Sequence, residues 1–213
     1  MTRQLKFSFF PILLLLFSVH TTEAQYYSYD KNISLGLTFS PNMSWLTFQD
    51  GDSRESNPKL GYAYGLVADL GFARNYYFST GLLINTLYSQ AMASGQADLV
   101  QDMTYRLQYA EVPIAIKLKT NAGSVARFYG QFGFTAGVNV SGKERIAPST
   151  QYRAIEGDDL FRLGLLIGAG AEWRLTNSLS AITGLSYNNG FTRAMKDGRP
   201  KLSYTALNIG LLF

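Results

Sequence analysis

The sequence contains no cysteine, and its only histidine, His20, lies near the N-terminus. The absence of cysteine excludes disulfides, thiolate metal ligands and a lipid-modified N-terminal cysteine. If the segment that holds His20 is removed, as argued below, no histidine remains for an ordinary zinc site or a Ser-His nucleophile pair. Enzymatic activity is therefore disfavoured, and we expect no catalytic residues, no metal and no cofactor.

Blocks of consecutive basic residues are also missing. The chain has 19 Lys and Arg against 15 Asp and Glu, and the net charge of +4 is spread along the sequence. Proteins that follow a nucleic-acid backbone carry a basic patch or stripe instead. We therefore expect no nucleic-acid partner.

Only one long apolar run is present, at residues 7–19, and it follows the basic residues Arg3 and Lys6. The run is shorter than the roughly 20 residues that a membrane-spanning helix needs. Small residues then lead to Ala24, as in a secretory signal with its cleavage site. The expected organisation is a signal peptide at 1–24, a short periplasmic segment at 25–32 and one domain at 33–213.

The rest of the chain shows period-2 alternation of apolar and polar residues, which predicts strands. We expect eight strands, near residues 33–46, 61–73, 76–90, 103–119, 126–141, 160–175, 178–189 and 201–213. Short connections with turn residues alternate with longer polar ones. A transmembrane barrel requires this pattern, with short periplasmic turns, long extracellular loops and both termini in the periplasm.

The direction of the apolar faces separates a membrane barrel from a soluble lipocalin-like barrel, which alternates in the same way. In the strand at 160–175, one face carries large apolar residues from Phe161 to Trp173. The other face carries Arg162, Glu172, Arg174 and several glycines. A charged and small face suits the narrow lumen of eight strands, and an apolar face suits lipid. The sequence thus predicts an eight-stranded antiparallel up-and-down transmembrane β-barrel in the bacterial outer membrane, with the membrane lipids as partners.

Aromatic residues are frequent, with 14 Tyr and 14 Phe, and they fall at two levels of the expected barrel. Aromatic girdles mark the two membrane interfaces of outer-membrane barrels. β-Propensity alone would explain the number of these residues but not their two levels. The predicted interface residues are Trp45, Tyr62, Phe72, Tyr76, Tyr88, Phe128, Phe161, Trp173 and Phe213.

The last expected strand alternates apolar residues up to the final position, with Leu207, Ile209, Leu211 and Phe213 on one face. This ending is typical of the signal by which the barrel-assembly machinery recognises its clients. We therefore expect that machinery to be a partner of the chain during assembly.

Three segments resemble the PorT-like family of outer-membrane barrels: YAEVPIAIKLK at 109–119, FYGQFGFTAGVNVSGK at 128–143 and GLLIGAGAEWRL at 164–175. Their order and spacing fit along essentially the whole domain. The motifs describe strands rather than an active site. The resemblance implies a barrel fold and, for the family's namesake, an accessory role in type IX protein secretion and gliding motility.

Seven ionisable residues have inward parity and are expected in or near the periplasmic half of the lumen. They are Asp69, Glu111, Lys117, Lys119, Arg127, Glu172 and Arg174. Because four are basic and three acidic, they can nearly neutralise one another as a structural plug. A narrow ion path or a docking site for a periplasmic segment is the functional alternative. An acid/base pair of Glu111 and Glu172 is disfavoured, because neighbouring cations keep both ionised.

Three functions remain open at this point. The first is a non-enzymatic structural or accessory barrel of the cell envelope, for example in a secretion assembly with other envelope proteins. The second is a small surface binding or adhesion barrel that uses its extracellular loops. The mixed charges of residues 142–159 fit a solvated surface or contact with lipopolysaccharide or a partner. The third is a narrow pore, which a filled eight-stranded lumen disfavours.

Overall fold

The computed structural model describes residues 33–48, 55–94, 100–121, 125–147, 149–155, 160–194 and 199–213. The predicted signal peptide and periplasmic segment lie outside these residues. The described strands are β1 (Ile33–Thr47), β2 (Glu55–Ala73), β3 (Tyr76–Ser94), β4 (Val100–Lys119), β5 (Ala126–Ile146), β6 (Arg153–Ala154), β7 (Phe161–Arg174), β8 (Ser180–Gly190) and β9 (Lys201–Leu212). In this part of the chain, no helix is long and apolar enough to cross a membrane.

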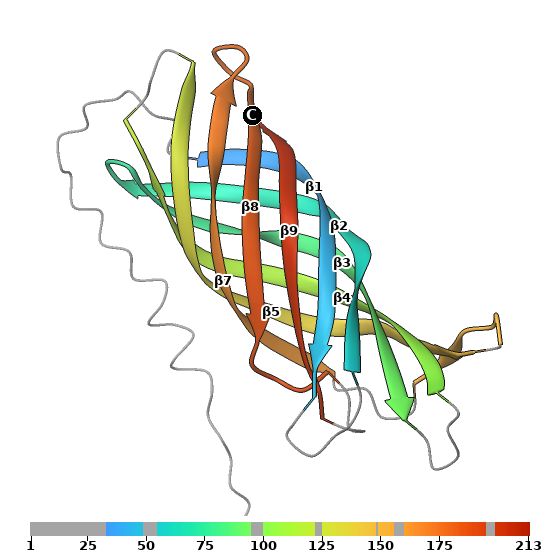
Figure 1. Ribbon diagram of the computed structural model, residues 1–213. Helices are drawn as coiled ribbons and strands as arrows, with labels where there is room; N and C mark the ends of the chain where they lie inside the picture. The colour runs from blue at the N-terminus through green and yellow to red at the C-terminus, as the bar shows by residue number, and fades with distance from the viewer. Residues whose placement is uncertain are drawn as a thin grey trace, which may run out of the picture. The chain divides into compact units, whose positions relative to one another are not determined.

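The eight long strands form a closed antiparallel barrel (Figure 1). Each long strand pairs with the next along the chain, and β1 pairs with β9 to close the wall. At this seam Leu35 and Phe213 exchange both backbone hydrogen bonds, with N···O distances of 3.1 and 2.7 Å. The predicted eight-stranded antiparallel barrel is confirmed.

The two ends of the barrel differ in their connections, as the sequence predicted. At the turn end, β2 and β3 are joined only by Arg74 and Asn75, and Asn75 has a φ of 68°. Asn tolerates this left-handed conformation better than most residues. At the same end, the Thr176 hydroxyl accepts hydrogen bonds from the backbone N–H groups of Ser178 and Leu179. The connections 48–54, 95–99, 147–160 and 191–200 follow the opposite ends of the strands, which we call the loop end. Three of them are longer than any connection at the turn end, but the β3–β4 connection is not, because β3 and β4 extend to Ser94 and Val100.

Strands β2 to β5 continue farther toward the loop end than the sequence predicted. Residues 55–60, expected in a loop, belong to β2, and the β3–β4 ladder extends to the pair Ser94 and Val100. The β4–β5 ladder likewise reaches Met103 opposite Ile146. We call residues 55–60, 89–94, 100–107 and 141–146, together with β6, the outer extension. The residues of this extension that were not predicted as strand, 55–60, 91–94, 100–102 and 142–146, lack the apolar alternation by which membrane strands are recognised.

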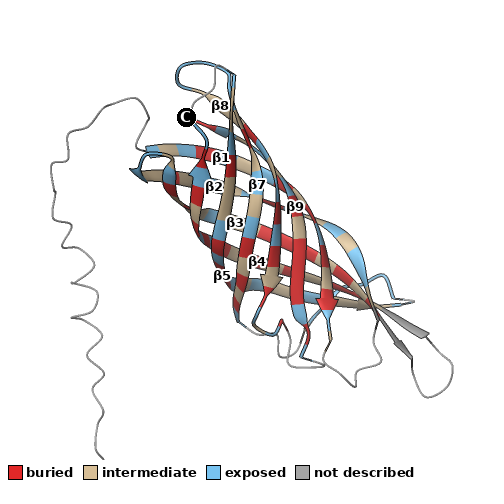
Figure 2. Ribbon diagram, turned by 60° about the vertical axis from the view of Figure 1, so that its left-hand side comes forward, coloured by how far each residue is buried: buried red, intermediate tan, exposed pale blue. Residues whose placement is uncertain are grey.

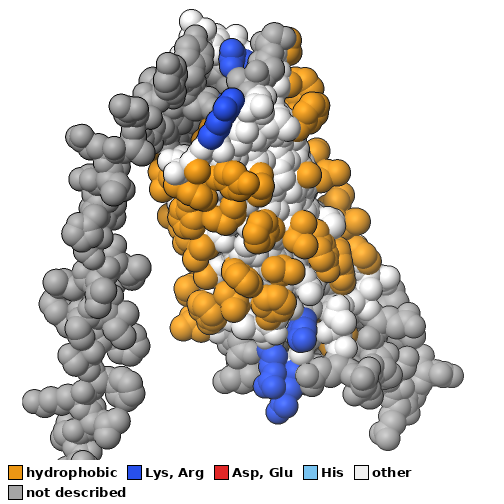
Figure 3. Space-filling model, turned by 90° about the vertical axis from the view of Figure 1, so that its left-hand side faces the viewer, with side chains coloured by type: hydrophobic (Ala, Val, Ile, Leu, Met, Phe, Trp, Pro, Cys, Tyr) orange, Lys and Arg blue, Asp and Glu red, His pale blue; other side chains and the backbone are white. Residues whose placement is uncertain are grey.

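Along the strands, buried and exposed residues alternate (Figure 2). The outward positions are large and apolar: Leu37 is 55% exposed, Ile167 51% and Leu185 66%. Figure 3 shows these side chains as a belt, with basic residues beyond it at both ends and no acidic residue on that face. An apolar exterior around a polar interior is the arrangement of a membrane barrel.

Candidate functional site in the lumen

Four charged side chains meet inside the barrel near the turn end, and we call them the turn-end network. Lys117 Nζ lies 2.8 and 3.0 Å from the two carboxylate oxygens of Asp69. Lys119 Nζ lies 3.0 Å from Asp69 Oδ2 and 2.8 Å from Glu172 Oε2. The Ser79 hydroxyl donates a further hydrogen bond to Asp69. Two cations and two carboxylates therefore neutralise one another.

Two aromatic rings pack against the lysines of this network, from positions beside them in the ladders. Lys119 Nζ lies 4.3 Å from the centre of the Tyr77 ring, and Lys117 Nζ lies 5.0 Å from that of Tyr129. The Tyr129 ring lies along the inner wall over the neighbouring strands β7 and β8, where a Cβ at its ladder partner Gly170 or at Gly184 would collide with its hydroxyl. Glycine at both positions makes room for the ring.

The other three predicted residues are Arg127, Arg174 and Glu111, and Arg127 lies beside the turn-end network. Arg127 is half-buried and stands opposite Glu172 in the β5–β7 ladder, whereas Arg174 is exposed at the end of β7. Glu111 was predicted in or near the periplasmic half of the lumen, and the structure corrects this, because Glu111 does not join the turn-end network. It lies near the middle of β4, and its ion-pair partner is Arg162, at 2.9 Å.

Glu111 and Arg162 form the centre of a second group, the loop-end network. Glu111 Oε2 accepts hydrogen bonds from Asn85 at 3.1 Å and from the Tyr204 hydroxyl at 2.9 Å. Arg162 donates to Glu111, to the Asn188 side chain and to the Leu202 carbonyl. Both charged side chains are buried, with Glu111 completely inaccessible. A buried ion pair is tolerated when such additional hydrogen bonds accompany it.

Neutral amides extend this network around the wall. Asn42 donates to Asn85 at 2.9 Å, and Asn188 donates to Thr135 at 2.8 Å. The loop-end network thus takes side chains from β1, β3, β4, β5, β7, β8 and β9. The inward parity of Arg162 was visible in the sequence, but its partners depend on the strand register, which the sequence does not state.

An apolar cluster closes the lumen beyond the loop-end network. Its fully buried members include Leu87 and Leu107, each 1% exposed, and Leu202, 2% exposed. Ala194, in the β8–β9 connection, belongs to the same cluster, and Ile155 packs against it. This apolar cap was not predicted from the sequence, because these leucines have the same parity as the polar residues expected to fill the lumen.

Side chains of the described residues occupy the lumen at several levels along the barrel. The turn-end network, the loop-end network and the apolar cap follow one another along an already narrow lumen. Glu111 and Glu172 belong to different networks, and each is paired with a cation. The described residues include no group of three or more His, Cys, Asp or Glu that could hold a metal ion.

The predicted interface aromatics lie on the outer surface near the two ends of the belt. Near the loop end, Trp45 stacks on Tyr187 and Tyr62 on Tyr64, with ring centres 6.2 and 6.4 Å apart. Tyr88 lies at the same end opposite Arg106, and Phe161 is exposed at the start of β7. Near the turn end lie Phe72, Tyr76, Phe128, Trp173 and Phe213. The apolar side chains of the last strand, Leu207, Ile209, Leu211 and Phe213, also point outward.

A closed antiparallel barrel with an apolar belt, aromatic ends and a filled lumen defines a small transmembrane β-barrel. Residues 23–195 match the family described as outer membrane protein beta-barrel domain, and the chain belongs to that family. It is accordingly a protein of the bacterial outer membrane. We expect the turn end to face the periplasm and the loop end to face outward, as in other outer-membrane barrels. A search of curated proteins finds no match.

Several solved structures resemble the chain at low identity. Neisserial surface protein A (NspA) is 10% identical, with a TM-score of 0.48 over 85% of this chain and 96% of that chain. OprG from Pseudomonas aeruginosa is 13% identical, with a TM-score of 0.48 over 85% and 94%. The attachment invasion locus protein Ail of Yersinia pestis is 15% identical, with a TM-score of 0.42 over 86% and 100%.

Proposed function

We propose that this protein is a non-enzymatic structural or accessory component of the outer membrane, and that it acts through its surfaces rather than through its lumen. The observation that carries this proposal is the filling of the lumen by two neutralised networks and an apolar cap. A solute path would have to break ion pairs that lie in a narrow, buried space. The PorT-like resemblance supports a secretion or gliding assembly as the setting of this role.

The outer extension is the surface best suited to contact another envelope component. It is a continuation of the barrel wall, so its position is set by the β2–β5 ladders rather than by a loop. Beyond Val138, β5 no longer pairs with β7. It stays paired with β4 along one edge, and along the other edge two of its described residues pair with β6. The extension therefore presents a firm surface beyond the membrane belt on one side of the barrel.

Site-specific photo-crosslinking in intact cells tests this proposal. A photoreactive residue replaces Tyr152, which is exposed near β6, and in a matched control it replaces Phe39, which is exposed in the apolar belt. We expect a discrete crosslink to an envelope protein from position 152 and none from position 39. The absence of protein crosslinks from position 152 and from neighbouring exposed positions of the extension would contradict the accessory role.

A surface binding or adhesion role is the second candidate, because the same extension and the β5–β7 connection face outward. Residues 142–146 belong to β5, so a test of this role should replace only residues 147–159 with a short turn. If adhesion is the function, this variant loses attachment to host cells or matrix while its barrel keeps its heat-modifiable mobility. Unchanged attachment by the folded variant would rule out an adhesion role for the β5–β7 connection.

A further inference from the structure

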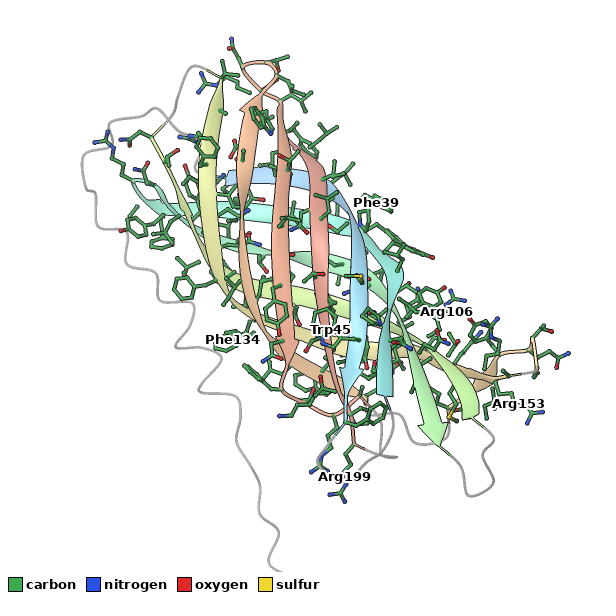
Figure 4. The ribbon with its side chains drawn as sticks, viewed as in Figure 1. Phe39, Trp45, Arg106, Phe134, Arg153 and Arg199 are labelled. Carbon is green, nitrogen blue, oxygen red and sulfur yellow. The ribbon has the colours of Figure 1, made fainter. Side chains whose placement is uncertain are left out.

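Three basic side chains gather on the outward face of the outer extension, and we call them the rim patch: Arg106, Lys143 and Arg145. Arg106 and Lys143 stand directly opposite each other in the β4–β5 ladder. Arg145 is two residues beyond Lys143 and therefore shares its face, about 7 Å away. Arg106 lies over the Tyr88 ring at 5.8 Å, and Arg145 lies over the Tyr152 ring at 5.4 Å. Figure 4 shows Arg106 on the outer side of this wall.

The rim patch has no acidic partner within the described part of the chain. None of its three residues forms an ion pair there. Glu144 lies between Lys143 and Arg145 in sequence, but it stands opposite the buried Tyr105 and so points to the other face. Like charges placed directly across a ladder repel and destabilise the pair. An external anion would remove this repulsion.

The distance of the rim patch from the apolar belt indicates which anions can reach it. The outward apolar surface of this wall ends at the pair Ala110 and Val138, with exposed Val140 just beyond. Arg106 is four residues farther along β4, which corresponds to about 9 Å along the membrane normal for a strand tilted by about 45°. The headgroup layer extends about 5–8 Å beyond the hydrocarbon core. Because Arg and Lys side chains bend toward such an interface, their charged ends reach the phosphate level.

We propose that Arg106, Lys143 and Arg145 bind the phosphates of an outer-leaflet lipid, with lipid A as the occupant. The planar guanidinium groups suit bidentate contact with phosphate, and Lys143 supplies a further positive charge between them. Tyr88 fixes Arg106 at the edge of the aromatic girdle, where the sugar phosphates of such a lipid lie. The site fastens one side of the barrel to the outer leaflet.

Titration of the purified full-length barrel in neutral detergent tests the site. The probes are lipid A, lipid A without its phosphates, and inorganic phosphate. We expect R106Q/K143Q to bind lipid A about thirtyfold more weakly than the wild type, since each basic residue at an anionic surface contributes about fivefold. The matched variant R74Q/R174Q removes two exposed basic residues at the turn end and should stay within about twofold of the wild type. R106K, which keeps the charge but loses the planar guanidinium group and its contact with Tyr88, should bind less tightly than the wild type and more tightly than R106Q/K143Q.

Folding of each variant is checked by its heat-modifiable gel mobility, and R106E serves as a second test if R106Q/K143Q fails to fold. Equal binding by R106Q/K143Q and the wild type overturns the proposal. So does equal binding of lipid A with and without its phosphates, or equal weakening in R74Q/R174Q. Binding of inorganic phosphate as tightly as lipid A reassigns the patch to a soluble anion. Tighter binding of a sulfated polysaccharide, with the same dependence on Arg106 and Lys143, assigns it to a different macromolecule.

Discussion

The two charged networks of the lumen both compensate buried charges, but they do so with different numbers of charged partners. In the turn-end network, Asp69 has two lysines as partners, and Lys119 is shared with Glu172. In the loop-end network, a single ion pair between Glu111 and Arg162 is surrounded by neutral amides and a tyrosine hydroxyl. Glu111 is completely inaccessible, whereas the Glu172 side chain is 13% exposed.

The difference shows how the number of partners determines the consequence of losing one. A buried ion whose only counter-ion is removed retains its desolvation cost without its attraction. Arg162 has no second carboxylate among the described residues, whereas Lys119 has one. Lys117 pairs only with Asp69, but Glu172 belongs to the same network and also attracts it. The loop-end network should therefore be the more sensitive of the two, although it contains fewer charges.

The largest effect is expected for Glu111→Gln. The new amide nitrogen must face either Arg162 or the two donors Asn85 and Tyr204, and Arg162 is left as an unpaired buried cation. We expect a loss of about 3–5 kcal/mol in the free energy of unfolding. Denaturant titration of the barrel in lipid vesicles, followed by the fluorescence of Trp45 and Trp173, measures this loss.

The double variant Glu111→Gln/Arg162→Gln is the control for this interpretation. It removes both charges and leaves neutral polar groups in a polar setting, so it should be less destabilised than Glu111→Gln alone. A double variant that is more destabilised than either single variant would mean that packing, rather than unpaired charge, causes the effect.

An intermediate effect is expected for Asp69→Asn. Lys117 loses its only carboxylate partner in the described residues, but Lys119 keeps Glu172 and the Ser79 hydroxyl can reorient. We expect a loss of about 2–3 kcal/mol, measured in the same titration. A loss larger than that of Glu111→Gln would reverse the ranking of the two networks.

The smallest effect is expected for Glu172→Gln. This side chain lies closest to solvent, and Lys119 retains Asp69 at 3.0 Å. The expected loss is below about 1 kcal/mol, as for other partly solvated pairs. A loss of several kcal/mol would show that the turn-end network acts as a single unit without redundancy.

The sequence was sufficient to predict the barrel, its strand number and the direction of its faces, because alternation and connection length depend on local residue order. Leu37 and Leu185 are exposed and Asp69 is buried, as their parity required. The extra length of β2–β5 was not predicted, because residues such as Glu55 to Lys59 extend a ladder through backbone pairing and show no apolar alternation.

The lumen was predicted only in outline. Parity identifies which residues point inward but not their height relative to residues of distant strands. Glu111 and Arg162 are 51 positions apart and meet only because of the registers of β4, β5 and β7. For the same reason, Leu87, Leu107 and Leu202 gave no sign in the sequence that they would meet as a cap.

The sealing of the lumen is tested most directly by the ionic conductance of the purified barrel in a planar lipid bilayer. Folding of the same sample is verified beforehand by its heat-modifiable mobility. We predict no steady conductance above that of the bare bilayer, because ion pairs and the apolar cap occupy the lumen at successive levels. A reproducible, steady conductance step for each inserted barrel would contradict this account and favour a pore.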